Sequence, residues 1–144
     1  MTQNSSHRDN LEIMEIHKEM DLIQGCITRM SNNSFWIKGG FISLLTIVLT
    51  MDNFNLTKEN GFFIIVAIFY LWYLDSFFLS VEKKYRKIYQ WVIVEREKGN
   101  RDLLYDLNPK RFETTVPFCT VFLSKTLLIF YGIPISVIVF KFLI

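Results

Sequence analysis

Residues 61–80 read GFFIIVAIFYLWYLDSFFLS, and this stretch decides the fold class. Its first part, Phe62–Leu74, carries no charge and ends at Asp75. Two further uncharged runs each follow a single lysine: Lys38 precedes Gly39–Met51, and Lys125 precedes Thr126–Phe140. Extended by their flanking residues to 35–51, 61–80 and 119–144, these runs reach the length typical of helices that cross a lipid bilayer. The sequence therefore predicts an all-α membrane protein with three transmembrane helices.

The overall composition agrees with this interpretation. Of 144 residues, 51% are hydrophobic and 16% are aromatic, which a soluble domain of this size would struggle to bury. Residues Met1–Asn10 are polar, so we expect no cleavable signal peptide. The first span would then act as its own targeting signal.

Basic residues set the expected orientation in the membrane. The segment Val81–Phe118 contains nine of them: Lys83, Lys84, Arg86, Lys87, Arg96, Lys98, Arg101, Lys110 and Arg111. The loop predicted over Asp52–Asn60 contains only Lys58. Because basic loops stay in the cytoplasm, we expect the N-terminus inside the cell and the C-terminus outside.

Five segments follow from these patterns. They are a cytoplasmic N-terminal helix over 1–34, transmembrane helices over 35–51, 61–80 and 119–144, and a cytoplasmic basic helix with a linker over 81–118. Within the first two, Leu11–Met51 is predicted as one long helix, with candidate breaks at Ser31–Asn33 or Gly39–Gly40. Residues Met1–Arg8 are predicted as a disordered tail.

A heptad repeat runs along this first helix, with Ser34 as its one polar member. Its members are Ile13, Ile16, Met20, Ile23, Ile27, Met30, Ser34, Ile37, Phe41, Leu44, Val48 and Met51. A period of 3.5 residues is the signature of helices that wind around each other. The stripe packs either on the protein's own helices or on other copies, and we favoured a homo-oligomer with long cytoplasmic helical extensions.

The opposite face of the same helix carries small and hydroxyl residues: Gly25, Thr28, Asn32, Gly39, Ser43, Thr46 and Thr50. Inside a bilayer, such residues either allow close helix packing or line a water-filled path. Both interpretations stay open. If the face lines a pore, its candidate residues are Lys38, Gly39, Ser43, Thr46 and Thr50.

The three flanking charges are expected at one level, near the cytoplasmic ends of the spans. Asp75 can form an ion pair with Lys38 or Lys125, which would pin the helices together. The leftover lysine would then stand alone or pair across a subunit boundary. Alternatively, Lys38 contributes a cationic ring at the mouth of a pore, and that ring would favour anions.

The segment Glu82–Trp91 interleaves cations with aromatic side chains. Contact with anionic lipid headgroups explains this pattern, and so does a site for an anionic ligand whose bases stack on the aromatic rings. The candidate ligand-binding residues are Lys83, Lys84, Arg86, Lys87, Arg96 and Arg101. The sequence does not decide between a nucleotide and a lipid.

Enzyme activity has no support in the sequence, which contains no phosphate-binding glycine loop and no nucleophile motif. No cofactor or metal site is predicted. The two histidines, His7 and His17, are interpreted as solvated side chains. The two cysteines, Cys26 and Cys119, fall on the cytoplasmic side of the expected topology and should remain reduced.

Several short stretches resemble a family of small bacterial inner-membrane proteins. The stretches include Asn33-Ser34-Phe35, Lys38-Gly39, Trp72-Tyr73-Leu74-Asp75, Tyr85-Arg86-Lys87 and Phe130-Tyr131-Gly132. The family is linked to antiphage defence, and the chain resembles a Hailong-like membrane channel effector. That resemblance implies a location in the bacterial inner membrane, with the C-terminus in the periplasm. It also implies a nucleotide or short DNA ligand made by a partner nucleotidyltransferase.

The expected function is therefore an oligomeric ion channel that depolarises the cell when a cytoplasmic nucleotide or oligonucleotide binds. The channel and its trigger depend on the resemblance, whereas the spans and the topology do not. Two other functions stay open. One is a holin-like or toxin-like protein that disrupts membranes without a ligand, and the other is a non-conducting membrane scaffold.

Overall fold

The computed structural model describes residues 2–50 and 58–143, and these residues form helices joined by turns. The four α-helices are α1 (Thr2–Thr50), α2 (Lys58–Glu97), α3 (Phe118–Phe122) and α4 (Lys125–Leu143). A short 3₁₀ helix, η1, covers Pro109–Phe112. Within the described residues there is no β-strand, which agrees with the all-α class expected from the sequence.

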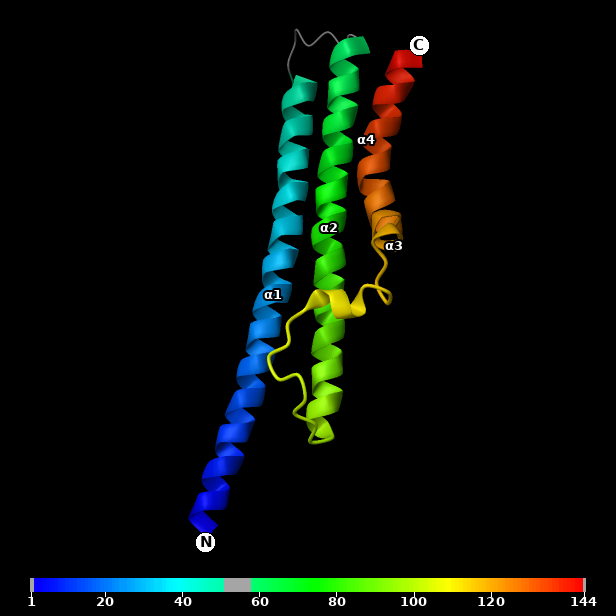
Figure 1. Ribbon diagram of the computed structural model, residues 1–144. Helices are drawn as coiled ribbons and strands as arrows, with labels where there is room; N and C mark the ends of the chain where they lie inside the picture. The colour runs from blue at the N-terminus through cyan, green and yellow to red at the C-terminus, as the bar shows by residue number, and fades with distance from the viewer. Residues whose placement is uncertain (1, 51–57, 144) are drawn as a thin grey trace.

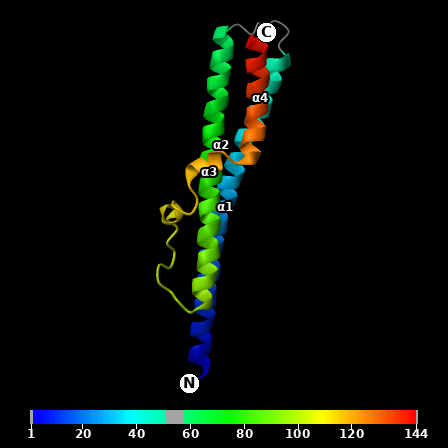
Figure 2. The same ribbon diagram turned by 90° about the vertical axis from the view of Figure 1, so that its right-hand side faces the viewer.

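The two long helices form a rod, and α4 joins only one half of it. Figures 1 and 2 show α1 and α2 side by side along most of their length, with the N-terminal end of α1 extending beyond the end of α2. The chain then turns back along α2, and α4 packs beside the half of α2 that contains the apolar run. The molecule thus has a three-helix half and a two-helix half.

Helix α1 is longer and more regular than we predicted. It begins at Thr2, so the disordered tail predicted for Met1–Arg8 is wrong. It also continues through Ser31–Asn33 and Gly39–Gly40, where we allowed a break. Tertiary contacts with α2 on both sides of these residues outweigh their modest helix propensity.

The heptad stripe of α1 packs on the chain's own α2 over its central part. Ile23, Ile27, Ser34 and Phe41 are all at most 6% exposed in the single chain. Ile13 is 52% exposed, and the side chain of Val48 and all of Met51 lie outside the described residues. The centre of the stripe is therefore not available for another copy, contrary to the interpretation that we favoured.

Two separate apolar clusters stabilise the two halves. Phe41, Ile68, Trp72, Leu127 and Tyr131 form the first, which joins α1, α2 and α4. The second is centred on Ile23, Ile27, Ile88 and Val92, and linker side chains pack against it. Polar residues occupy the zone between the clusters, and these residues form the candidate site.

The segment predicted as one span over 119–144 consists of two helices. Helix α3 ends at Phe122, and Leu123 forms the break before α4 begins at Lys125. Trp72 explains part of this break, because its Nε1 donates a hydrogen bond of 3.1 Å to the carbonyl of Phe122. Helix α4 then continues through Pro134 to Leu143.

Among the described residues, one helix is long and apolar enough to cross a membrane. It is α2, over Asn60–Glu97, and by length and composition alone it is weak evidence for membrane association. A shorter apolar stretch covers Lys125–Phe140 in α4. The external loop predicted over Asp52–Asn60 falls mostly on residues outside the described ranges.

Candidate functional site

A buried carboxylate lies where the three-helix half meets the two-helix half. Asp75 of α2 is 0% exposed. Its Oδ1 accepts hydrogen bonds from Ser34 Oγ and from Lys38 Nζ, the latter at 2.7 Å. Its Oδ2 accepts a hydrogen bond of 3.1 Å from the Tyr131 hydroxyl. We call Ser34, Lys38, Asp75 and Tyr131 the Asp75 cluster.

The cluster joins three helices that are far apart in the sequence. Lys38 Nζ also donates a hydrogen bond of 2.7 Å to Ser34 Oγ, so the two α1 side chains support each other. A buried charge is tolerated only when it is paired and hydrogen-bonded, and Asp75 has both kinds of partner. The cluster therefore links α1, α2 and α4 and stabilises their packing.

Only one of the two lysines considered for Asp75 pairs with it. Lys38 forms the ion pair and its side chain is 27% exposed. Lys125 is exposed at the start of α4, and within the described part of the chain it has no ion pair. Because Asp75 neutralises Lys38, the cationic ring expected from Lys38 loses its physical basis.

The remaining pore-lining candidates lie on a face of α1 that the chain leaves uncovered. Gly39, Ser43, Thr46 and Thr50 are all exposed. The three hydroxyls donate to carbonyls of their own helix at Gly39, Ile42 and Thr46. A Cβ added at Gly39 would meet no atom within 4 Å, so among the described residues no other helix packs against it.

A second buried ion pair lies in the two-helix half. Arg96 of α2 donates from Nε and Nη2 to the two carboxylate oxygens of Glu19 of α1, each at 2.9 Å. Their side chains are 3% and 1% exposed. The hydrogen bond to Glu19 raises the pKa of Arg96 above its ordinary value. Arg96, a predicted ligand-binding residue, is thus already occupied by Glu19.

The same pair anchors the linker that follows α2. Arg96 Nη1 donates to the carbonyls of Asn100 and Asp102, and Glu19 Oε1 accepts the backbone N–H of Tyr105. Leu103 and Tyr105 have positive φ angles of 60° and 62°, which non-glycine residues rarely adopt. The ion pair therefore supports a backbone conformation that a free linker would avoid.

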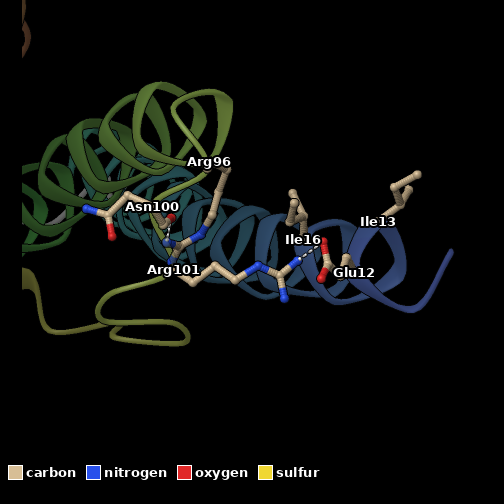
Figure 3. A pocket seen from close by; sticks show the side chains of 7 residues that line it. Glu12, Ile13, Ile16, Arg96, Asn100 and Arg101 are labelled. Atoms are coloured by element: carbon tan, nitrogen blue, oxygen red, sulfur yellow. Dashed lines mark hydrogen bonds and ion pairs between the residues drawn. The ribbon is translucent and has the colours of Figure 1, made fainter. Parts of the chain in front are cut away.

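A pocket of about 320 Å³ opens beside this pair, where α1 meets the end of α2. Figure 3 shows Arg101 reaching across it to Glu12, with Ile13 and Ile16 of α1 alongside. Arg101 pairs with Glu12 at 2.9 Å and with Glu15 at 3.6 Å. Its guanidinium is thus balanced by two carboxylates, and it too is a weaker candidate for an anionic ligand than expected.

The other four predicted ligand residues lie on α2, about two to three turns beyond Asp75. Lys83 and Lys84 are half-buried, whereas Arg86 and Lys87 are exposed. Arg86 pairs with Glu82 one turn earlier at 2.8 Å, and Lys87 donates to Gln90 at 3.4 Å. The Lys87 contact is exposed and weak, so an anion could displace it at little cost. An anion that displaced Arg86 would leave the carboxylate of Glu82, whose side chain is 9% exposed, without its counter-ion.

An apolar groove lies beside α3, at the level of the helix break. It has a volume of about 380 Å³ and is lined by Tyr73, Phe118, Cys119, Phe122 and Leu123. The rings of Tyr73 and Phe118 lie 5.5 Å apart, and those of Trp72 and Phe122 stack at 4.7 Å. Through these ring contacts α3 packs on α2, and the groove lies between them.

Sequence reasoning missed two of the groups that define these sites. Tyr131 was noted only within the stretch Phe130-Tyr131-Gly132, although a buried hydroxyl needs a partner. Glu19 was not among the candidate residues. For Ser34 a signal existed, because it was the one polar member of the heptad stripe. Over the described ranges, no group of three His, Cys, Asp or Glu side chains is placed to hold a metal ion.

Comparison with known proteins adds no relative to this picture: no protein-family model, no curated protein and no solved structure matches the chain.

Proposed function

We propose that this chain is an inner-membrane protein with three spans that assembles with copies of itself into an ion channel. The first support is its surface. Large apolar side chains such as Phe35, Trp36, Phe63 and Phe140 are 64–73% exposed in the single chain. A soluble monomer rarely exposes apolar side chains on this scale. The 19 residues of α4 extend about 28 Å, close to the hydrocarbon thickness of a bilayer.

The observation that carries the channel proposal is the uncovered polar face of α1. In the half of the chain with apolar spans, one face of α1 is buried against α2 and α4. The other face presents Gly39, Ser43, Thr46 and Thr50. Their hydroxyls are satisfied as donors within the helix, while their oxygens keep lone pairs for water. Copies arranged with this face inward would enclose a path lined by neutral hydroxyls.

The trigger in this proposal is an anionic ligand at the cytoplasmic boundary of α2. Lys83, Lys84 and Lys87 are the favoured contacts, since Arg86, Arg96 and Arg101 are each paired with a carboxylate. A nucleotide or short oligonucleotide made by a partner enzyme, as the family resemblance implies, would act there. Opening would depolarise the cell, as an antiphage effector does.

The test combines particle mass with conductance. The purified protein should have the mass of an oligomer in detergent and should pass current in a planar bilayer. Thr46→Val removes a hydroxyl from the proposed lining and should lower the single-channel conductance. Ser136→Val is the matched control, because the Ser136 hydroxyl makes the same kind of bond to its own helix on α4.

Each failure has a distinct meaning. A particle with the mass of one chain contradicts the oligomer. An oligomer without current favours a scaffold. A holin-like or toxin-like disruptor would conduct without any added ligand. Its current would also stay unchanged when Lys83, Lys84, Arg86 and Lys87 are neutralised.

A further inference from the structure

The groove beside α3 has no polar lining. Tyr73, Phe118, Cys119, Phe122 and Leu123 surround it, and Leu123 and Cys119 are exposed. In water, such an opening would be costly, because it leaves aromatic and aliphatic surface unburied. In a bilayer, the same opening lies beside acyl chains. Its natural occupant is therefore a flexible hydrocarbon chain.

A positive charge follows directly at the end of the groove. Leu123 lines it, and Lys125 is exposed two residues later, at the first position of α4. Of the three charges that flank the spans, Lys38 and Asp75 neutralise each other. Lys125 is left without an ion pair within the described part of the chain. The site thus combines an apolar groove with an unbalanced cation.

Neighbouring polar atoms fit the same ligand. Ser124 Oγ is shielded from solvent and has no hydrogen-bond partner among the described residues. The first backbone N–H groups of α4 have no partner within their own helix, as at any helix start. These N–H groups, unlike the shielded Ser124 hydroxyl, are available to an anion that binds at Lys125.

The groove is also held in shape before any ligand binds. Trp72 Nε1 fixes the Phe122 carbonyl at 3.1 Å, and the Trp72 ring stacks on Phe122. Trp72 and Tyr73 are the residue types that prefer the boundary between headgroups and hydrocarbon. Asp75 and Lys38, at the same level, mark the cytoplasmic end of the spans in the proposed topology.

We propose that the α3–α4 junction binds an anionic phospholipid of the cytoplasmic leaflet. An acyl chain occupies the groove formed by Tyr73, Phe118, Cys119, Phe122 and Leu123. The phosphate lies at Lys125. This inference depends on the membrane location proposed above, but not on the channel.

The experiment measures lipid binding to the full chain in detergent by native mass spectrometry. Phosphatidylglycerol and phosphatidylcholine with identical acyl chains are the two probes. The unmodified chain should bind phosphatidylglycerol about fivefold more tightly, the ratio expected for one basic side chain at an anionic lipid surface. Lys125→Gln should remove this preference. Lys110→Gln, which changes an exposed lysine of η1, should keep it.

A second pair of variants tests the groove. Cys119→Phe fills it and should weaken binding of both lipids. Thr120→Phe adds the same ring to the adjacent exposed position outside the groove and should not. Circular dichroism reports whether each variant keeps its helices. Equal affinity of the unmodified chain for the two lipids overturns the proposal, and so does a preference that survives Lys125→Gln.

A separate measurement distinguishes this failure from failure of the membrane proposal. Trp36 is 73% exposed, so in a bilayer its fluorescence should be quenched by brominated phosphatidylcholine. The quenching should fall in the Trp36→Phe variant. Quenching without a preference for phosphatidylglycerol rejects the lipid site alone, whereas absence of quenching rejects insertion in the membrane.

Discussion

Glu19 and Arg96 lie 77 positions apart and meet through two parallel hydrogen bonds of 2.9 Å. A guanidinium and a carboxylate are matched in this two-point geometry, which lysine does not reproduce. The pair joins α1 to the end of α2. Glu19 also accepts a hydrogen bond from the backbone N–H of Tyr105 in the linker. The pair therefore holds three segments of the two-helix half at once.

Removing the carboxylate of Glu19 should destabilise the protein strongly. Glu19→Ala leaves the charge of Arg96 buried and unpaired, which typically costs about 3–5 kcal/mol. Chemical unfolding in detergent, followed by circular dichroism, measures this loss. Glu12→Ala is the matched control: it removes another carboxylate of α1 paired with an arginine, but one that is 54% exposed. Its cost should be about 1 kcal/mol or less.

The effect of the buried charges of Glu19 and Arg96 on stability can be measured separately from the effect of their side-chain packing. Replacing both partners, as Glu19→Met with Arg96→Met, removes the buried charges together and should recover most of the stability lost in Glu19→Ala. A double variant as unstable as the single one would contradict this account. The linker would then depend on the carboxylate's bond to Tyr105 rather than on the ion pair.

Asp75→Ala should be the most damaging single change in the three-helix half. It removes the shared acceptor of Ser34, Lys38 and Tyr131 and leaves a lysine partly buried without its counter-ion. The expected cost is about 3–5 kcal/mol, measured by unfolding in mixed detergent micelles. Asp102→Ala, at an exposed position of the linker, is the control and should change stability little.

Tyr131→Phe should cost much less, because it removes one hydroxyl and keeps the ring. The lost hydrogen bond to Asp75 is worth about 1 kcal/mol. Tyr70→Phe removes a hydroxyl from a side chain that is 62% exposed, and its effect should be close to zero. If the two variants are equally stable in the same unfolding assay, Tyr131 does not support Asp75.

The pKa of Glu95 should depend on the hydrogen bonds in the turn that ends α2. Hydrogen bonds from Lys98 and then from Asn100 lower the pKa of Glu95 below 4.5. Because the folded-state pKa is the lower one, this contribution to stability is present above pH 4.5 and is lost as the pH falls through the folded-state pKa. Lys98→Gln should raise the pKa, and Asn100→Ala should raise it less. Carboxyl carbon shifts followed by NMR against pH measure both changes.

Cys26 provides a test of orientation. It is partly exposed on α1, in the half that the proposed topology places in the cytoplasm. In a Cys119→Ser background, a membrane-impermeant maleimide should label Cys26 in inverted vesicles and not in intact spheroplasts. Labelling in spheroplasts alone would reverse the topology.

The helices were predictable from the sequence because their signals are local. Apolar runs and the heptad stripe lie within single segments, and the buried positions Ile23, Ile27, Ser34 and Phe41 were all members of that stripe. The choice of partner was not local. A heptad stripe fits the chain's own α2 as well as another copy, and here the centre of the stripe packs on α2.

The charged contacts were predictable only where the candidates were few. Asp75 had two lysines to choose from, and the structure selects Lys38. The pairing of Glu19 with Arg96 could not be predicted. Each lies among many similar charges, and their neighbouring residues do not indicate a partner 77 positions away. The break at Leu123 was also missed, since it arises when α3 packs on Trp72 and Tyr73.

Helix α2 runs without interruption from Lys58 to Glu97, over about 60 Å. No hinge separates its two ends, and Asp75 sits near its midpoint. A displacement of the end near Arg96 should therefore also be felt at the Asp75 cluster, because no break in α2 absorbs it.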